Sequence, residues 1–220
     1  AIDLLFQLLV DSEKAPENPF KPVDTATLKT AVAAWLDDRV AAYLFYGSIK
    51  FWDTSLITEM DNLFQDGING DTKSFNYDIS RWDLSSVTNV FEMFSGASSF
   101  NQDLSIWNVS NVGDFGQMFQ DATSFNQDLS IWEISSSKTF DGMFNGATSF
   151  SQILCWDLSC ADPVANCTIA DIFLNTNGAK ADLLEAKCIT PSDPPSAAPS
   201  ESPSSSPSAS PSESLSAAPS

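Results

Sequence analysis

The sequence predicts an α/β repeat solenoid, a stack of about five short-strand coils with helical turns that lies between two caps. The nine residues SFNQDLSIW occur twice, unchanged, at 99–107 and at 124–132. A period of roughly 20–29 residues is typical of stacked units that bury a continuous core only against one another. Here the step is 25 residues, and it connects Phe75, Phe100, Phe125 and Phe150; Phe94, Phe119 and Phe144; and Trp82, Trp107 and Trp132.

The apolar positions of one unit predict its secondary structure. Leu104, Trp107, Val109 and Val112 follow the pattern L-x-x-W-x-V-x-x-V, so the expected fold is leucine-rich-repeat-like. The period-2 spacing of Trp107 and Val109 predicts a short strand with both side chains inside the coil. The next apolar residues, up to Ala122, are spaced by three and four, which predicts one or two helical turns.

The tryptophans are expected to form one internal column through the stack, with the phenylalanines in other columns. A tryptophan row could instead offer a sugar-stacking face, but its place in the repeat pattern favours the core. In strand-built coils, equivalent side chains lie ~4.8 Å apart. The column would contain Trp52, Trp82, Trp107, Trp132 and Trp156.

The residues before the repeats predict two helices that cap the first coil. Asp24 or Thr25 can N-cap a helix, because side-chain oxygens of these residue types accept hydrogen bonds from free backbone N–H groups. A second short helix is expected to run to Tyr46 and to end at Gly47. The first helix would cover the coil with Leu28, Val32, Trp35 and Leu36.

All four cysteines fall in one stretch after the repeat fails, at Cys155, Cys160, Cys167 and Cys188. An even count clustered in a cap predicts two disulfides, for which three connectivities are possible. A zinc site with four thiolates is the alternative. It is less expected because the spacing C-x4-C-x6-C-x20-C contains no C-x2-C pair.

The chain as a whole divides into five segments. From Pro191 on it consists mostly of Pro, Ser and Ala, which bury too little apolar surface to order the chain, so a disordered stalk or, equally, a linker is expected. The segments are an N-terminal extension at 1–23, a helical cap at 24–47, repeats at 48–154, a cysteine-containing cap at 155–190 and the Pro/Ser-rich tail at 191–220.

Composition argues against several classes of function. The formal net charge is −19, and nucleic acids and anionic membranes bind basic surfaces, so neither is an expected partner. The absence of histidine removes the commonest general base and imidazole metal sites. No apolar run approaches the ~20 residues of a membrane span, so no membrane insertion is expected. AIDLLFQLLV is a poor signal peptide, and a chain that begins at Ala1 is expected to have lost its start and any export signal.

The units FNQDLSIWNVSNVGDFGQMFQDATS and FNYDISRWDLSSVTNVFEMFSGASS resemble those of BspA-like leucine-rich-repeat surface proteins. The upstream LKTAVAAWLDDRVAAYLFYGSIKFWDTSLITEMDNLF is similar to the helical segment before the repeats in that family. The resemblance covers 25–150 and implies a secreted, cell-surface or cell-wall solenoid that serves adhesion or protein binding and has no catalytic residues. The tail resembles those of secreted or wall-associated proteins in diatoms and related algae.

Side chains that point away from the core are expected to line a ligand-binding face. The positions beside each tryptophan combine an apolar patch with an acidic lane, next to a row of serines. Such a lane suits recognition of a surface protein or a polysaccharide, although a merely solvated face has the same composition. The expected face consists of Phe51, Asp53, Arg81, Asp83, Ile106, Asn108, Ile131 and Glu133.

Two groups of oxygen-bearing side chains are candidates for Ca²⁺, the one cofactor considered, which prefers carboxylate and carbonyl ligands. The first is a column of aspartates, which would repel one another unless they accept backbone N–H bonds or share a cation: Asp78, Asp103 and Asp128. The second is the loop QDGINGDTKS with Asp66, Asn69 and Asp71, which Gly-Asp turns explain equally well. A third column, Asn76, Asn101 and Asn126, is expected to hydrogen-bond the backbone of its own and the neighbouring coil.

These observations lead us to expect a non-enzymatic recognition or adhesion module, with a structural wall or matrix component as the alternative. An enzyme is not expected, because the carboxylates repeat down the stack, whereas catalysis needs unique groups placed once in a pocket. Of two glycosylation sequons, Asn166 is the expected acceptor. A glycan at Asn108 would obstruct the expected face.

Overall fold

The computed structural model describes residues 16–137, 139–152, 154, 156 and 172–176. All described residues belong to one compact unit that lies within 1–186. The four cysteines, Asn166 and the Pro/Ser-rich tail lie outside the described residues. The disulfides, the glycosylation site and the stalk therefore stay predictions.

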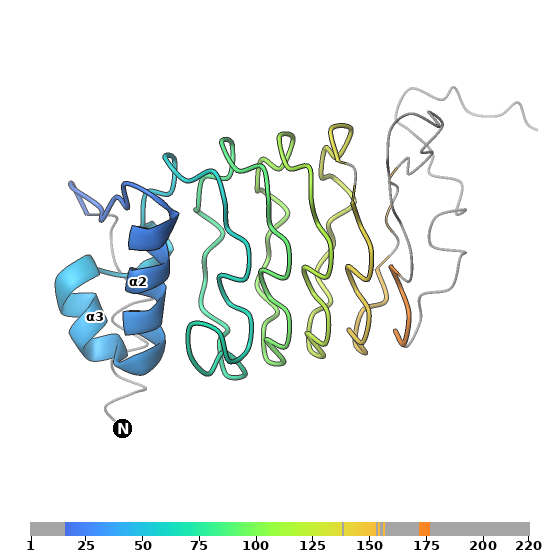
Figure 1. The fold of residues 1–220 in the computed structure, drawn as a ribbon, viewed down its shortest axis with the longest axis horizontal. Coiled ribbons are helices and arrows are strands. Elements are labelled where there is room, and N and C mark those ends of the chain that lie inside the picture. The colour runs from blue at the N-terminus through green and yellow to red at the C-terminus, as the bar shows by residue number, and fades with distance from the viewer. Residues whose placement is uncertain (1–15, 138, 153, 155, 157–171, 177–220) are drawn as a thin grey trace, which may run out of the picture. The chain divides into compact units, whose positions relative to one another are not determined.

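The first helix of the cap, α2, spans Thr25–Asp37 (Figure 1). It begins where the Asp24 carboxylate accepts a hydrogen bond from the backbone N–H of Thr27 at 2.7 Å. Its inner face is fully buried, and the ring of Trp35 lies edge-on against Trp52 of the first coil, with 5.9 Å between the centroids. This helix and its role as a cover for the first coil are confirmed.

The second helix, α3, spans Arg39–Tyr46, and a 3-10 turn, η1, follows at Ile49–Phe51. The Asp38 carboxylate accepts hydrogen bonds from two backbone N–H groups in the first turn of α3. The helix ends at Gly47, whose φ of 68° suits a residue without a Cβ atom. The predicted end of this helix is also confirmed.

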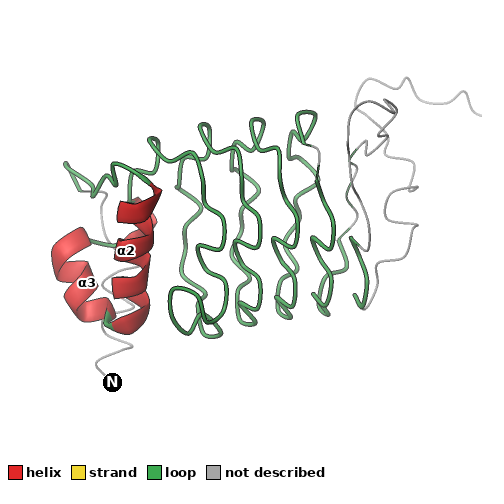
Figure 2. Cartoon of the chain, in the orientation of Figure 1, coloured by secondary structure: helices red, strands yellow, loops and turns green. Residues whose placement is uncertain are grey.

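The prediction of an α/β, leucine-rich-repeat-like solenoid is wrong. Among the described residues after η1, the coils contain neither strands nor helices (Figure 2). Their β-type pairing consists of isolated parallel bridges that join Glu59 to Asn89, Asn89 to Asp114, and Asp114 to Thr139. Each coil is instead a succession of tight turns.

Asx turns replace the predicted strand. The Trp107 N–H donates to the Leu104 carbonyl at 3.1 Å, and a second turn from Val109 to Val112 follows directly. Each turn is preceded by a residue whose side-chain oxygen accepts a hydrogen bond from the backbone N–H two positions later. Asp103 accepts from the Ser105 N–H, and Asn108 accepts from the Ser110 N–H. Asp and Asn favour this geometry over a continuous strand, because their side chains satisfy the backbone locally.

Left-handed residues replace the predicted helical turns. Glu92, Gln117 and Asp121 have φ of 54–55°, a conformation that interrupts any α-helix. The Phe119 N–H consequently donates to the Met143 carbonyl of the next coil at 2.8 Å, not to a residue one helical turn earlier. The three-and-four spacing of apolar residues therefore reflects overlapping turns that keep the same side chains inside.

Backbone hydrogen bonds fasten each coil to the next at this same position. The N–H donors lie at equivalent places in four coils, and each bond measures 2.8 Å. They run from Phe64 to Met93, from Phe94 to Met118, from Phe119 to Met143 and from Phe144 to Ile172. The last bond shows that residues 172–176 continue the stack beyond the recognised repeats.

Aromatic columns fill the interior, as predicted. Successive rings of the Phe64–Phe94–Phe119–Phe144 column stack with centroids 5.4–5.5 Å apart, and Phe173 adds a further ring at 5.6 Å. The tryptophan column is also buried, with exposed fractions of 1–5%. Its indole N–H groups donate to carbonyls of the preceding coil, from Trp82 to Ile49, Trp107 to Ile79, Trp132 to Leu104 and Trp156 to Leu129.

The asparagine column ties neighbouring coils together, which confirms its predicted structural role. The Asn101 Oδ1 atom accepts the Asn126 N–H at 2.9 Å and the Gln127 side-chain amide at 3.0 Å. The same arrangement links Asn76 to the coil of Asn101, through the Asn101 N–H at 2.9 Å.

Replacing Asn101 with alanine is expected to lower the free energy of unfolding by about 1–3 kcal/mol, because the Asn126 N–H loses its acceptor and the Gln127 side-chain amide keeps only the Asn101 backbone carbonyl. Urea denaturation measures the loss. Asn101→Asp keeps an acceptor oxygen at the same place and should recover at least half of the difference. Equal losses in the two variants would contradict the role of this oxygen.

Candidate binding face

The turn that precedes each tryptophan builds the candidate binding face. In the turn 104–107, the closing hydrogen bond leaves Ile106 at an outer corner. The equivalent turn 129–132 places Ile131 at the same corner of the next coil. These two isoleucine side chains are 69% and 72% exposed, so neighbouring coils present large apolar groups in one row.

At the capped end of this row, Arg81 lies over Phe51, with 5.2 Å between the guanidinium carbon and the ring centroid. A hollow of about 280 Å³ opens beside this pair. Half of the predicted face residues thus surround one hollow. Its lining consists of Pro16, Pro19, Phe51, Trp52, Asp53, Thr54, Arg81 and Asp83.

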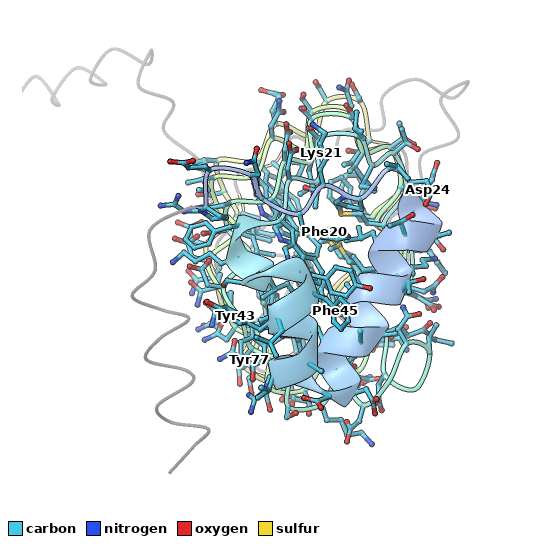
Figure 3. All side chains as sticks on the ribbon, turned by 90° about the vertical axis from the view of Figure 1, so that its left-hand side faces the viewer. Phe20, Lys21, Asp24, Tyr43, Phe45 and Tyr77 are labelled. Carbon is cyan, nitrogen blue, oxygen red and sulfur yellow. The ribbon has the colours of Figure 1, made fainter. Side chains whose placement is uncertain are left out.

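The N-terminal extension holds the acidic side of the hollow. Lys21 donates hydrogen bonds to Asp53 Oδ2 and Ser55 Oγ, both at 2.8 Å. The Asp53 N–H also donates to the Phe20 carbonyl at 2.9 Å, so the extension runs along the first coil before it enters α2 (Figure 3). The hydrogen bond from Lys21, and to a lesser degree that from Ser55, lowers the pKa of Asp53. Burial raises this pKa, but the hydrogen bonds outweigh it. Lys21 was not predicted as a neighbour of the face, because no repeat spacing relates it to the coils.

Two further polar residues of the face, Asp83 and Asn108, each hold a turn with one side-chain oxygen. Asp83 Oδ1 accepts the Ser85 N–H at 2.8 Å, and Asn108 Oδ1 accepts the Ser110 N–H at 3.2 Å. Asp83, Asn108 and Glu133 are nevertheless exposed. The acidic lane is therefore partly structural and partly available to a ligand.

The candidate Ca²⁺ residues are engaged in hydrogen bonds within the chain. In the column, Asp78, Asp103 and Asp128 each accept the N–H of a serine two residues on, at 2.9–3.0 Å. The described part of the chain brings no three acidic, cysteine or histidine side chains together as a metal site. In the loop, Asp66 pairs with Lys73, Asn69 donates to two carbonyls, and Asp71 accepts the Lys73 N–H. Ca²⁺ binding therefore stays a prediction, and local hydrogen bonds explain the geometry of both groups.

Asp78 differs from the other aspartates of its column because it has a lysine partner. Lys50 Nζ lies 2.6 Å from Asp78 Oδ2, and both side chains are less than one-third exposed. Burial raises the pKa of Asp78, but hydrogen bonds from Lys50 and Ser80 outweigh this effect and leave the pKa below its usual value. A lowered pKa in the folded state stabilises the fold above about pH 4, and this contribution disappears as the pH falls through the folded-state pKa.

Replacing Asp78 with asparagine is expected to lower the free energy of unfolding by about 0.5–1 kcal/mol at pH 7 and to have little effect at pH 2. Asparagine still accepts the Ser80 N–H, so the change removes the charge but leaves the turn. Urea denaturation at the two pH values measures the difference. Asp103→Asn, which removes a charge from the same column, is the control; a loss at Asp78 that persists at pH 2 would contradict the ionic contribution.

Residues 38–156 match the family model described as "Mycoplasma protein of unknown function, DUF285", which spans more than half of the chain. The chain belongs to the DUF285 family. The matched part of this DUF285 protein begins just before α3 and includes the whole candidate face. No curated protein and no solved structure matches the chain.

The family description of DUF285 names no activity, ligand or partner. A location at the cell surface is compatible with the match. Within the described part of the chain, none of the helices has the length and apolar character needed to cross a bilayer.

Proposed function

We propose that this DUF285 protein is a non-enzymatic recognition or adhesion module that binds a protein or a glycan through its outer row of Phe51, Arg81, Ile106 and Ile131. One observation carries the proposal: Ile106 and Ile131 stand at the same corner of neighbouring coils with more than two-thirds of each side chain exposed. Scattered exposed apolar residues are normal on a protein surface, whereas aligned ones favour an interaction site.

The chemistry around the row suits a binding site of this kind. The stacked Arg81 and Phe51 side chains offer a flat platform on which an apolar or sugar ring can pack. Asp53 and Asp83 place carboxylates at the edge of the adjacent hollow, where they can accept hydrogen bonds. An apolar centre with a polar rim is the usual arrangement of a protein interface.

We place this activity outside the cell, on a protein that is secreted or held at the cell surface or in the wall. The partner would be a surface protein or a polysaccharide without a strong negative charge, because the chain itself carries a formal net charge of −19. The resemblance to BspA-like surface proteins supports the same location.

The alternative is a structural wall or matrix component without a specific ligand. One observation favours it: Asp83 and Asn108 each use a side-chain oxygen to accept a backbone N–H of their own turn, so that oxygen serves the fold. A structural component would tolerate substitution of the exposed isoleucines, whereas a recognition module would not.

The test is binding of the full chain to arrays of glycans and of surface proteins. The variant Ile106→Asp/Ile131→Asp is expected to weaken binding to any captured partner at least tenfold, which corresponds to about 1.4 kcal/mol. Ile68→Asp is the matched control, since Ile68 is 61% exposed but lies in the inserted loop, and it should bind within twofold of the parent. Unaltered binding by a folded double variant would refute the proposed face, and weak binding to all surfaces would favour the structural alternative.

A further inference from the structure

The outer side of α3 presents apolar side chains that neither the core nor the candidate binding face uses. Val40, Leu44 and Phe45 are 47%, 79% and 86% exposed, although the helix has only eight residues. Ala42 on the same helix is buried, and Tyr43 and Tyr46 pack against the core. In Figure 3, which looks onto the cap, α3 lies in front with Phe45 in view. A helix that is apolar on its outer side as well as its inner side is typical of one that is covered on both.

We propose that residues 2–10 of the same chain cover this outer side of α3. Their sequence, IDLLFQLLV, contains seven apolar residues and a single charge. Apolar residues at Ile2, Leu5, Phe6 and Leu9 follow helical spacing, while Asp3 and Gln7 fall four residues apart on another side. This pattern matches a segment that packs one apolar face against a partner and exposes the other.

The described part of the extension lies close to the C-terminal end of α3. The Phe20 ring lies 4.6 Å from the ring of Tyr46, the last residue of α3, and Tyr46 lies 6.3 Å from Phe45. Pro16, the first described residue, lines the hollow together with Phe51 and Trp52, and the Trp52 ring lies 5.9 Å from that of Tyr46 at the end of α3. Five residues, 11–15, lie between Val10 and Pro16, so these six steps span at most about 22 Å, whereas α3 is about 12 Å long. The segment therefore has enough chain to turn back along the helix.

A site-specific photo-crosslink in the full chain tests this placement. A photoreactive p-benzoylphenylalanine replaces Phe45, and irradiation is followed by cleavage after lysine and mass spectrometry. Cleavage after Lys14 releases peptide 1–14, while the crosslinker remains in peptide 30–50. The expected product joins these two peptides within one chain, and its yield does not change on dilution.

Two variants make the result specific. Leu5→Asp/Leu9→Asp should reduce the crosslink yield at least fivefold, because it places charges on the proposed contact side. Asp3→Asn/Gln7→Glu alters the other side and should leave the yield unchanged. The same photoreactive residue at Ile131 should give no product with peptide 1–14.

Three outcomes would overturn the inference. A product whose yield rises with concentration and joins two chains would show that a second copy covers α3. A product with a segment other than 1–14 would assign a different occupant. A folded protein that forms no crosslink from Phe45 would show that this side of α3 faces solvent.

Discussion

Replacing Phe119 with alanine is expected to lower the free energy of unfolding by about 3–5 kcal/mol, the usual cost of removing a large aromatic side chain from a packed core. The Phe119 side chain is fully buried and stacks between Phe94 and Phe144 at 5.5 Å on either side. Its ring also lies 3.9 Å from that of Phe125 in the same coil. The backbone bonds between coils hold these neighbours apart, so the cavity cannot close easily. Urea denaturation followed by tryptophan fluorescence measures the effect.

Ile131→Ala is the control for this loss. The Ile131 side chain is 72% exposed, so its truncation should change the free energy of unfolding by no more than about 0.5 kcal/mol. A typical domain has a total stability of roughly 5–15 kcal/mol, so Phe119→Ala should consume a large share of it. A loss below about 1 kcal/mol at Phe119 would mean that the phenylalanine columns are not the core.

Replacing Gly96 with alanine is expected to lower the free energy of unfolding by about 2–4 kcal/mol, through backbone strain and a steric clash together. Gly96 has φ of 75°, which disfavours any residue with a Cβ atom. A Cβ atom there would lie 2.8 Å from the Cβ of Asp66 in the preceding coil. That atom cannot swing away, because it is attached directly to a backbone whose N–H is bonded to Ser95 at 2.8 Å.

Gly113→Ala is the matched comparison, one coil further along the stack. A Cβ atom at Gly113 would meet its nearest neighbour, the Thr88 carbonyl oxygen, at an ordinary 3.7 Å. This substitution should change stability by less than about 1 kcal/mol and can raise it, because alanine restricts the unfolded chain. Thermal or urea unfolding of both variants decides the point; similar losses at the two glycines would contradict the close approach of coils at Gly96.

The positions of core side chains follow directly from the repeat, because each coil must fit the next. The 25-residue step identified the phenylalanine and tryptophan columns that the structure buries. The cap helices were equally predictable, since Asp24 is a strong N-cap and Gly47 a strong stop signal. These predictions depend on local chemistry and periodicity alone.

Secondary structure within the coil was not predictable from apolar spacing, because turns and regular elements can bury the same positions. The signal for turns was present in Asp103 and Asn108, each followed two residues later by the serine whose N–H it binds. The left-handed conformations of Glu92 and Gln117 carried no such signal, since these residue types seldom adopt them. They are imposed by hydrogen bonds to the neighbouring coil.

Contacts from outside the repeats were also missed. Pro16, Pro19 and Lys21 reach the candidate face although the extension shares no spacing with the coils. Phe173 continues a phenylalanine column, and the pair Ile172-Phe173 resembles Met118-Phe119 and Met143-Phe144. That similarity is visible in the sequence. The contact of Lys21 with Asp53 is visible only in the structure.

Turns, stacked by hydrogen bonds between coils, align the exposed corners into one row. The scalar coupling across the hydrogen bond of the Phe119 amide tests this stacking most directly by NMR. We expect a coupling from the Phe119 nitrogen to the carbonyl carbon of Met143, in the next coil. A coupling to the carbonyl carbon of Phe115, four residues earlier in the same coil, would show a helix there and would contradict the account.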